Sequence, residues 1–183
     1  MKLNYNFFLI FALFCSNAIS QTADEYSTKT AFMVKMTHFI NWPEKSVEQS
    51  KNNSPESLFT ICIDGSQKYF NSLENWATSG VIKKKPVALK YVTSNISSLN
   101  NCNILYITKN HNLDTYLKAA NEKHFLTISD NPGNAKRGVI VNFSNEREKI
   151  GFEINLDAAH RQGFKINPRL LKLAKIVSSE VKK

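Results

Sequence analysis

Glycine, proline and cysteine are scarce in this sequence, with 6, 5 and 3 residues among 183. So little glycine and proline excludes a collagen-like chain or a low-complexity linker, and three cysteines are too few for a miniprotein held together by disulfides. Hydrophobic residues make up 42% of the chain and aromatic residues 11%, which excludes global disorder and provides enough apolar surface for a core. We therefore expect a folded chain with a single domain.

Catalytic and metal-binding motifs are also lacking, since the sequence contains neither the G-x-S-x-G turn of serine hydrolases nor the H-E-x-x-H helix of zinc proteases. Residues 133–138 have the glycine spacing of a P-loop, but Val139 and Ile140 stand where that motif needs Lys and Ser or Thr. Asp130 is either a site residue or a turn residue that bonds its own backbone. The histidines are scattered without the spacing of metal ligands: His38, His111, His124 and His160. We expect no catalytic residue, no metal and no cofactor.

The one long apolar run lies at the N-terminus. Residues 7–15 (FFLIFALFC) follow the basic Lys2 and precede Ala18 and Ser20, which are small residues at the −3 and −1 positions of a signal-peptidase site. The run is well short of the ~20 residues that a membrane-spanning helix needs, so a signal peptide is favoured over a membrane anchor. We expect residues 1–20 to be a signal peptide cleaved near Ser20, and residues 21–183 to be the exported domain.

Export changes how the cysteines and the net charge are interpreted. Cys15 would leave with the signal peptide, so that Cys62 and Cys102 remain. A cysteine pair in an exported domain most often forms a disulfide, and two separate buried thiols are the alternative. Loss of Lys2 with the signal peptide lowers the net charge from +9 to +8. The charge is spread along the chain, so a solvated basic surface is the default interpretation, and acidic partners such as anionic lipid headgroups or an acidic protein face are the alternative. An exported protein rarely meets nucleic acid, which we do not expect as a partner.

Helix and strand patterns alternate along the chain. Apolar spacing predicts helices over residues 23–40, 67–77 and 113–120, and a closing helix whose apolar face holds Leu170, Leu173, Ala174 and Val177. The first of these should stop at the Trp42-Pro43 pair. The predicted strands are 58–63, 87–92, 102–107 and 125–128, with a polar loop at 46–57, a charged turn at 83–86, a loop at 129–138 and a β-hairpin of 139–143 and 150–154. This alternation predicts an α/β fold: a single-domain three-layer sandwich whose mostly parallel sheet is flanked by helices and carries a late antiparallel hairpin.

Two segments near the ends of the chain carry the longest signatures. Residues 29–43 read KTAFMVKMTHFINWP, and residues 152–166 read FEINLDAAHRQGFKI. They resemble the opening K-A-A-F-L-Y-N-F-A-K-F-V-E-W-P and the closing F-E-I-N-L-D-A-A-R-R-A-G-L-K-I of the YfiR-type (YfiR/HmsC) family of periplasmic proteins. The strands between them occur in the family's order, so the resemblance covers essentially the whole mature chain.

The resemblance implies a non-enzymatic repressor in the periplasm. Members of this family bind the periplasmic sensor domain of an inner-membrane diguanylate cyclase and hold it inactive, which lowers cyclic di-GMP and biofilm formation. An outer-membrane peptidoglycan-binding lipoprotein can sequester the repressor, and a homodimer is common in such folds. We also expect Cys62 and Cys102 to join the first and third strands. The alternative function is a periplasmic small-ligand sensor that relays binding to a membrane receptor.

The residues favoured for partner contact lie around the last strand of the hairpin and the segment after it: Glu153, Arg161, Phe143, Asp157 and Asn155. Glu153 and Arg161 come first. A structural alternative exists for each: Asn155 or Asp157 can cap the following helix, and Glu153 can pair with Arg161 or a lysine. Phe143 and Phe152 belong to the core unless exposed, in which case an aromatic ring beside a carboxylate could anchor a partner side chain.

Overall fold

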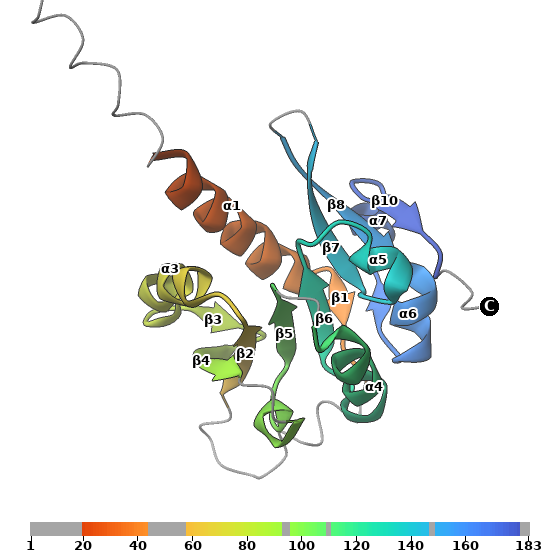
Figure 1. Ribbon diagram of the computed structural model, residues 1–183, viewed down its shortest axis with the longest axis horizontal. Helices are drawn as coiled ribbons and strands as arrows, with labels where there is room; N and C mark the ends of the chain where they lie inside the picture. The colour runs from red at the N-terminus through yellow and green to blue at the C-terminus, as the bar shows by residue number, and fades with distance from the viewer. Residues whose placement is uncertain (1–19, 44–57, 93–95, 109–110, 147–148, 180–183) are drawn as a thin grey trace, which may run out of the picture.

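A computed structural model describes residues 20–43, 58–92, 96–108, 111–146 and 149–179 (Figure 1). The helices are α1 (Ser20–Thr37), α3 (Gln67–Ala77), η2 (Ile96–Leu99), α4 (Leu113–Lys123), α5 (Asn134–Arg137), α6 (Leu156–Arg161) and α7 (Pro168–Leu171). The strands are β1 (Ile40–Asn41), β2 (Phe59–Asp64), β3 (Val81–Ile82), β4 (Lys85–Val92), β5 (Ile104–Ile107), β6 (Leu126–Ser129), β7 (Val141–Glu146), β8 (Lys149–Asn155), β9 (Lys165–Ile166) and β10 (Lys175–Val177). The predicted signal peptide and the predicted loop at 46–57 lie outside the described residues, apart from Ser20 at the start of α1. Within the described ranges, no helix is long and apolar enough to cross a membrane.

Eight strands form one mixed sheet in the order β10-β8-β7-β6-β5-β2-β4-β3. The strands from β4 to β7 run parallel, β7 and β8 form an antiparallel hairpin, and β10 runs parallel to β8. Strands β1 and β9 form a separate antiparallel pair. The predicted α/β architecture with a mostly parallel sheet and a late hairpin is confirmed.

Helices cover both faces of the central strands. All four residues of β5 and all four of β6 are buried, as expected for parallel strands covered on both sides. One core cluster joins the sheet to α1 and α3 through residues such as Met33, Leu73 and Tyr106. A second cluster joins the opposite face to η2 and α4 through residues such as Leu99 and Tyr116. The sheet is therefore the middle of three layers.

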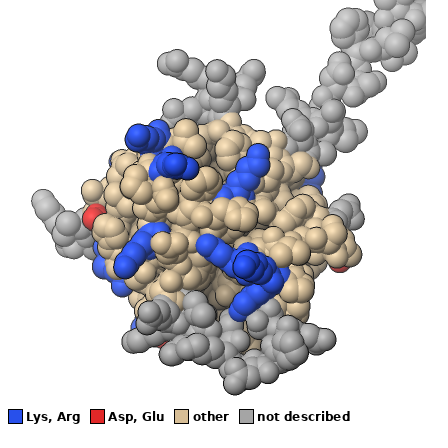
Figure 2. Space-filling view, turned by 180° about the vertical axis from the view of Figure 1, so that it is seen from behind, with Lys and Arg blue, Asp and Glu red and all other residues tan. Residues whose placement is uncertain are grey.

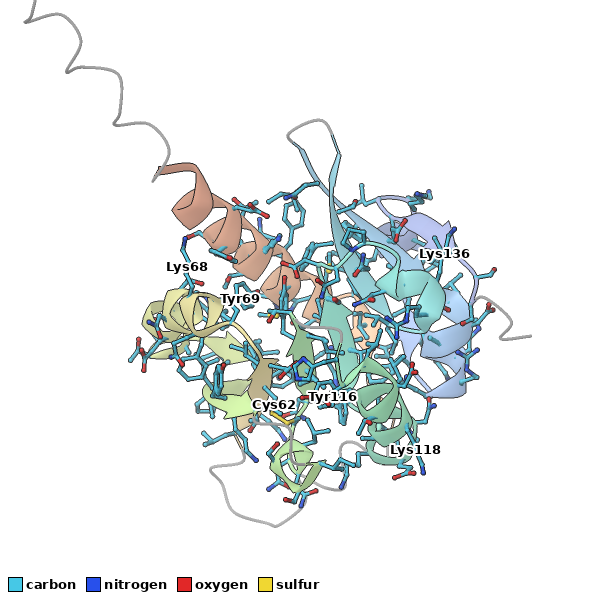
Figure 3. The ribbon with its side chains drawn as sticks, in the orientation of Figure 1. Cys62, Lys68, Tyr69, Tyr116, Lys118 and Lys136 are labelled. Atoms are coloured by element: carbon cyan, nitrogen blue, oxygen red, sulfur yellow. A yellow bond between two sulfur atoms is a disulfide. The ribbon has the colours of Figure 1, made fainter. Side chains whose placement is uncertain are left out.

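Cys62 and Cys102 form a disulfide, as predicted (Figure 3). Cys62 lies in β2, and Cys102 lies two residues before β5, the parallel neighbour of β2. The two Cα atoms are 5.7 Å apart, and both side chains belong to the core on the α4 face. The disulfide thus connects β2 to the segment that leads into β5, inside the core formed with η2 and α4.

The first helix ends three residues before the predicted boundary. α1 stops at Thr37, whose hydroxyl donates to the Val34 carbonyl, and Ile40 begins β1 instead. Ile40 pairs with Ile166 of β9. The apolar spacing of residues 39 and 40 continued the helical pattern, but pairing with a strand more than a hundred residues later takes them out of the helix.

The predicted closing helix is wrong. α7 ends at Leu171, and Lys175–Val177 form β10, which pairs with β8 in register Ile176 to Ile154. Leu173 was expected on the apolar face of that helix, but it is 74% exposed. The apolar spacing favours a helix, but the edge of β8 offers backbone hydrogen bonds to an extended segment. These hydrogen bonds decide the conformation of residues 175–177.

Short elements that were not predicted include β3 and α5, besides η2 and β9. The predicted charged turn at 83–86 is the tip of a β3–β4 hairpin and the first two residues of β4. The predicted loop at 129–138 contains the one-turn helix α5, flanked by Gly133 and Gly138 with left-handed φ values of 82° and 116°. Both elements are shorter than the window in which a periodic pattern can be recognised.

We expect loss of the disulfide to destabilise the fold without changing its topology. For a bridge across 40 residues, the chain-entropy model gives about 4 kcal/mol of unfolding free energy, from which native strain subtracts. A C62S/C102S variant should show this loss in urea denaturation, and the wild-type protein should show the same loss after reduction. A change below about 1 kcal/mol in both measurements would contradict a structural role for this disulfide.

Candidate functional site

A cavity of about 400 Å³ opens where β6 ends and the β7–β8 hairpin continues past it. The last paired residue of β6 is Ser129, opposite Asn142, so β7 from Phe143 onward is not covered by β6. α1, the β6–α5 loop and the hairpin contribute the lining residues: Lys29, Asp130, Pro132, Gly133, Asn142, Phe143, Ser144, Asn145 and Glu153. In Figure 1 the hairpin projects beyond the sheet on the side where α1 begins.

Lys29 forms one wall of the cavity from the buried face of α1. It is 4% exposed, and its Nζ lies 2.8 Å from Asp130 Oδ2 and 2.7 Å from Glu25 Oε1. Burial by itself lowers the pKa of the ammonium, but the hydrogen bonds to Asp130 and Glu25 outweigh this effect and the net pKa is raised. A buried ammonium of this kind is stable only because two carboxylates compensate its lost hydration.

Glu25 joins the helix to the hairpin. Its Oε1 accepts a hydrogen bond from Asn145 Nδ2 at 2.8 Å in addition to the ion pair with Lys29. The hydrogen bonds from Lys29 and Asn145 hold the pKa of the Glu25 carboxyl below its ordinary value. Through Lys29 and Glu25, one side of α1 is therefore bonded both to the β6–α5 loop and to the β7 strand.

The opposite wall carries Glu153 of β8, whose side chain is 12% exposed and lies 3.0 Å from the Lys175 ammonium of β10. Asn142, in register with Glu153, is 1% exposed, and its Oδ1 has no hydrogen-bond partner among the described residues. Formal charges around the cavity are three negative (Glu25, Asp130, Glu153) and two positive (Lys29, Lys175). The cavity therefore carries a net charge of −1 on a chain whose net charge is +9.

The floor of the cavity is aromatic. Phe143 is 1% exposed and its ring centroid lies 6.4 Å from that of Tyr106, which is itself 4.2 Å from the ring of Tyr69. Burial raises the pKa of the Tyr69 and Tyr106 phenols. Tyr69 is labelled in Figure 3. Phe143 and Phe152 are both buried, so the exposure that the anchor-pocket interpretation required is not met.

The five residues predicted for partner contact fall in two places. Glu153 and Phe143 belong to the cavity, whereas Asn155, Asp157 and Arg161 gather around Ser179 after β10.

Asn155 is a structural residue, as its capping alternative proposed. Its Oδ1 accepts from the Ala158 amide at 2.8 Å at the start of α6, and its Nδ2 donates to the Ala135 carbonyl at 2.6 Å. It is fully buried. The exposed side chains at this second place are Asp157, which accepts from the Ser179 amide, and Arg161, which donates to the Ser179 hydroxyl.

The sequence did not reveal the ion-paired cluster of Lys29, Glu25 and Asp130. It left Asp130 as either a site residue or a turn residue. The structure makes Asp130 the partner of Lys29, 101 positions away in the chain. One signal could have revealed it: Lys29 is spaced four and seven residues from Met33 and Met36, the buried face of α1, where a lysine needs a counter-charge. No group of three or more His, Cys, Asp or Glu side chains in the described part of the chain is arranged to hold a metal ion.

Comparison with known proteins gives a family and a fold. The model of the YfiR/HmsC-like family matches residues 26–175. No curated protein matches the sequence. Among solved structures, the chain is similar to the ABC domain from Streptococcus pneumonia, solved in complex with L-Trp, with a TM-score of 0.51 and 13% identity. The match covers 72% of this chain but only 59% of that chain, and at this identity it shows the fold alone.

We expect the Lys29–Asp130 pair to stabilise the fold. D130N leaves the buried ammonium with one carboxylate, and the unfolding free energy should fall by about 1–3 kcal/mol in urea denaturation. The double variant K29M/D130N should lose less than the sum of the two single variants, because the unpaired charge is gone. The matched control is D114N, which breaks the exposed 3.5 Å pair with Arg137 and should change stability by less than about 0.5 kcal/mol. Equal losses in D130N and D114N would contradict a stabilising pair.

The same cluster predicts an acid dependence. Because the folded-state pKa of Glu25 is lowered below 4.5, its contribution to stability is present above that pH and is lost as the pH falls through the folded-state value. The urea midpoint of the wild-type protein should therefore decline below about pH 4.5 more steeply than that of E25Q. Parallel pH profiles for the two proteins would show that Glu25 does not contribute.

Proposed function

This chain belongs to the YfiR/HmsC-like family of periplasmic regulators of diguanylate cyclase signalling, and from that premise we propose that it binds the periplasmic sensor domain of an inner-membrane diguanylate cyclase and holds the enzyme inactive. The family match over residues 26–175 is the observation that carries the proposal. The expected output is a lower level of cyclic di-GMP and less biofilm.

Repression of this kind requires binding and no chemistry. The repressor must prefer the inactive conformation of the cyclase, because a ligand shifts a conformational equilibrium only by its difference in affinity for the two states. A preference of about 100-fold corresponds to about 2.7 kcal/mol and moves a balanced equilibrium almost entirely to the inactive side. The YfiR/HmsC-like family is regulatory and non-catalytic, which agrees with this requirement.

We place the contact surface along β8, β10 and α6, with Glu153 and Arg161 as first contacts and Asp157 beside them. β10 is the last strand of the sheet, and Ile176 on it is 45% exposed. Arg161 and Asp157 lie at the far end of this edge, and Glu153 lies at the cavity. Phe143 and Asn155 are buried and would support this surface from beneath.

We add three accessory proposals. The mature chain, 21–183, would act in the periplasm after removal of its signal peptide. An outer-membrane peptidoglycan-binding lipoprotein would sequester it and so release the cyclase. A homodimer would be its assembled form. Each of these would tune how much repressor is free to reach the cyclase, which is a mass-action effect.

A periplasmic small-ligand sensor is the second candidate function, and the cavity is the observation that favours it. Its volume of about 400 Å³ is in the range of small-molecule sites, and it combines an aromatic floor with buried polar side chains. A structure with a similar fold was solved in complex with L-Trp, so free amino acids are the first ligands to test.

Repression predicts a specific binding result. The purified mature protein should bind the isolated periplasmic domain of the cyclase, and E153K and R161E should each weaken binding at least about tenfold, as measured by calorimetry. K68E is the control, because Lys68 is exposed on α3, at the opposite end of the sheet from β10 and α6 (Figure 3). Deletion of the gene should raise cellular cyclic di-GMP. Unchanged cyclic di-GMP together with no binding would overturn the proposal.

Ligand sensing predicts a different result in the absence of any partner. A free amino acid that occupies the cavity should raise the melting temperature of the wild-type protein and should raise that of E153Q less, because Glu153 lines the cavity. R161K serves as the control outside the cavity. Melting temperatures that do not respond to any free amino acid would argue against this second function.

A further inference from the structure

The side of the molecule seen in Figure 2 is basic. Lysine and arginine side chains are spread across it, and the acidic side chains in view lie only at its rim. We call the basic face the surface formed by the end of α1, the tip of the β3–β4 hairpin and the β9–α7 segment, whose exposed cations are Lys35, Lys83, Lys84, Lys165, Arg169 and Lys172.

Three segments that are far apart in the sequence are bonded together to make this face. The end of α1 leads into β1, whose Asn41 pairs with Lys165 of β9. The Asn167 amide donates to the Phe39 carbonyl at 2.8 Å, which brings the start of α7 and Arg169 to the same place. Lys83, at the tip of the β3–β4 hairpin, donates from Nζ to the Ile40 carbonyl at 3.0 Å.

The acidic side chains with established contacts lie elsewhere in the described structure. Glu25 and Asp130 are bonded to Lys29 at the cavity, and Glu153 is bonded to Lys175. Asp114 faces Arg137, and Asp157 bonds the Ser179 amide. None of these carboxylates is bonded to a residue of the basic face.

The tip of the β3–β4 hairpin holds two of these lysines in an unfavourable backbone conformation. Lys83 and Lys84 have left-handed φ values of 53° and 63°, the conformation for which two-residue hairpin turns normally use Asn and Gly. A lysine in this conformation is less stable than a glycine would be. The chain nevertheless places two lysines there, and it holds Lys83 over the ring of Trp42, with Nζ 5.3 Å from the ring centroid.

Apolar side chains are exposed among these cations. Phe39 is 36% exposed at the junction of α1 and β1, and Leu173 is 74% exposed directly after Lys172. Basic residues combined with a few exposed aromatic and aliphatic side chains are typical of surfaces that lie on a phospholipid bilayer.

We propose that the basic face docks on an anionic phospholipid bilayer. Its charges come from three segments and spread over a broad surface, so they match a plane of lipid phosphates better than the compact acidic patch of a protein. Each Lys or Arg close to an anionic membrane strengthens binding about fivefold, and the attraction reaches about 10 Å. Docking would keep the repressor at the membrane in which its proposed target is embedded. The inference rests on the charge of this face and not on repression.

The test is co-sedimentation of the mature protein with vesicles. Vesicles of phosphatidylcholine mixed with phosphatidylglycerol should bind the wild-type protein, vesicles of phosphatidylcholine alone should not, and added salt should release it. K35E/R169E/K172E should bind the anionic vesicles at least about tenfold more weakly than the wild type.

The matched control is K68E/K118E/K136E, which changes the net charge by the same amount at exposed residues outside the basic face (Figure 3). It should keep most of the binding. Equal loss in the two triple variants would show that only net charge matters and would overturn the docking surface. Failure of the wild-type protein to bind anionic vesicles would overturn the proposal and leave an acidic protein as the partner of this face. No cyclase is present, so neither outcome bears on repression.

A single substitution separates binding from folding. K84G relieves the left-handed lysine, so its melting temperature should equal or exceed that of the wild type, while vesicle binding should weaken about fivefold. Unchanged vesicle binding would show that the hairpin tip does not belong to the docking surface. It would overturn the argument drawn from the backbone of this tip.

Discussion

The ion pair between Lys29 and Asp130 is the contact on which the arrangement of this molecule depends. It bonds a buried lysine of the first helix to the end of a central strand, and Glu25 extends the same network to the β7–β8 hairpin. Without these carboxylates, burial of the ammonium would oppose docking of α1 on the sheet. With them, α1 has a defined position, and a polar cavity remains where β6 ends and the hairpin continues.

The molecule has two surfaces of opposite charge. The cavity has a net charge of −1 and its charged side chains form ion pairs, whereas the basic face collects exposed cations from the end of α1, a hairpin tip and the β9–α7 segment. A regulator that acts by binding can use both at once, because one surface can hold it at the membrane while the other edge meets a partner. Binding at either surface requires no catalytic side chain.

Local patterns predicted most elements and failed where a distant segment competed. The helix over 67–77 was predicted at its observed bounds. Its start is fixed locally, because the Ser66 side chain accepts a hydrogen bond from the Tyr69 amide, and its apolar face is regular. β10 was predicted as helix because Leu170 and Leu173 have helical spacing, but the edge of β8 offered backbone hydrogen bonds that the sequence pattern does not reveal. Of the residues that line the cavity, Glu153 and Phe143 had been predicted as partner contacts, and Lys29 had not been singled out.

By itself, the sequence determined the fold class, the family, the disulfide partners and most of the strands, because these follow from composition, short-range periodicity and two long signatures. Only the tertiary structure decided where α1 ends, that β10 is a strand, which carboxylates neutralise Lys29, and which lysines share a face. The physical reason is the same in each case. Hydrogen-bond partners and counter-charges come from segments distant in the chain, and periodicity within one segment carries no information about what will lie beside it.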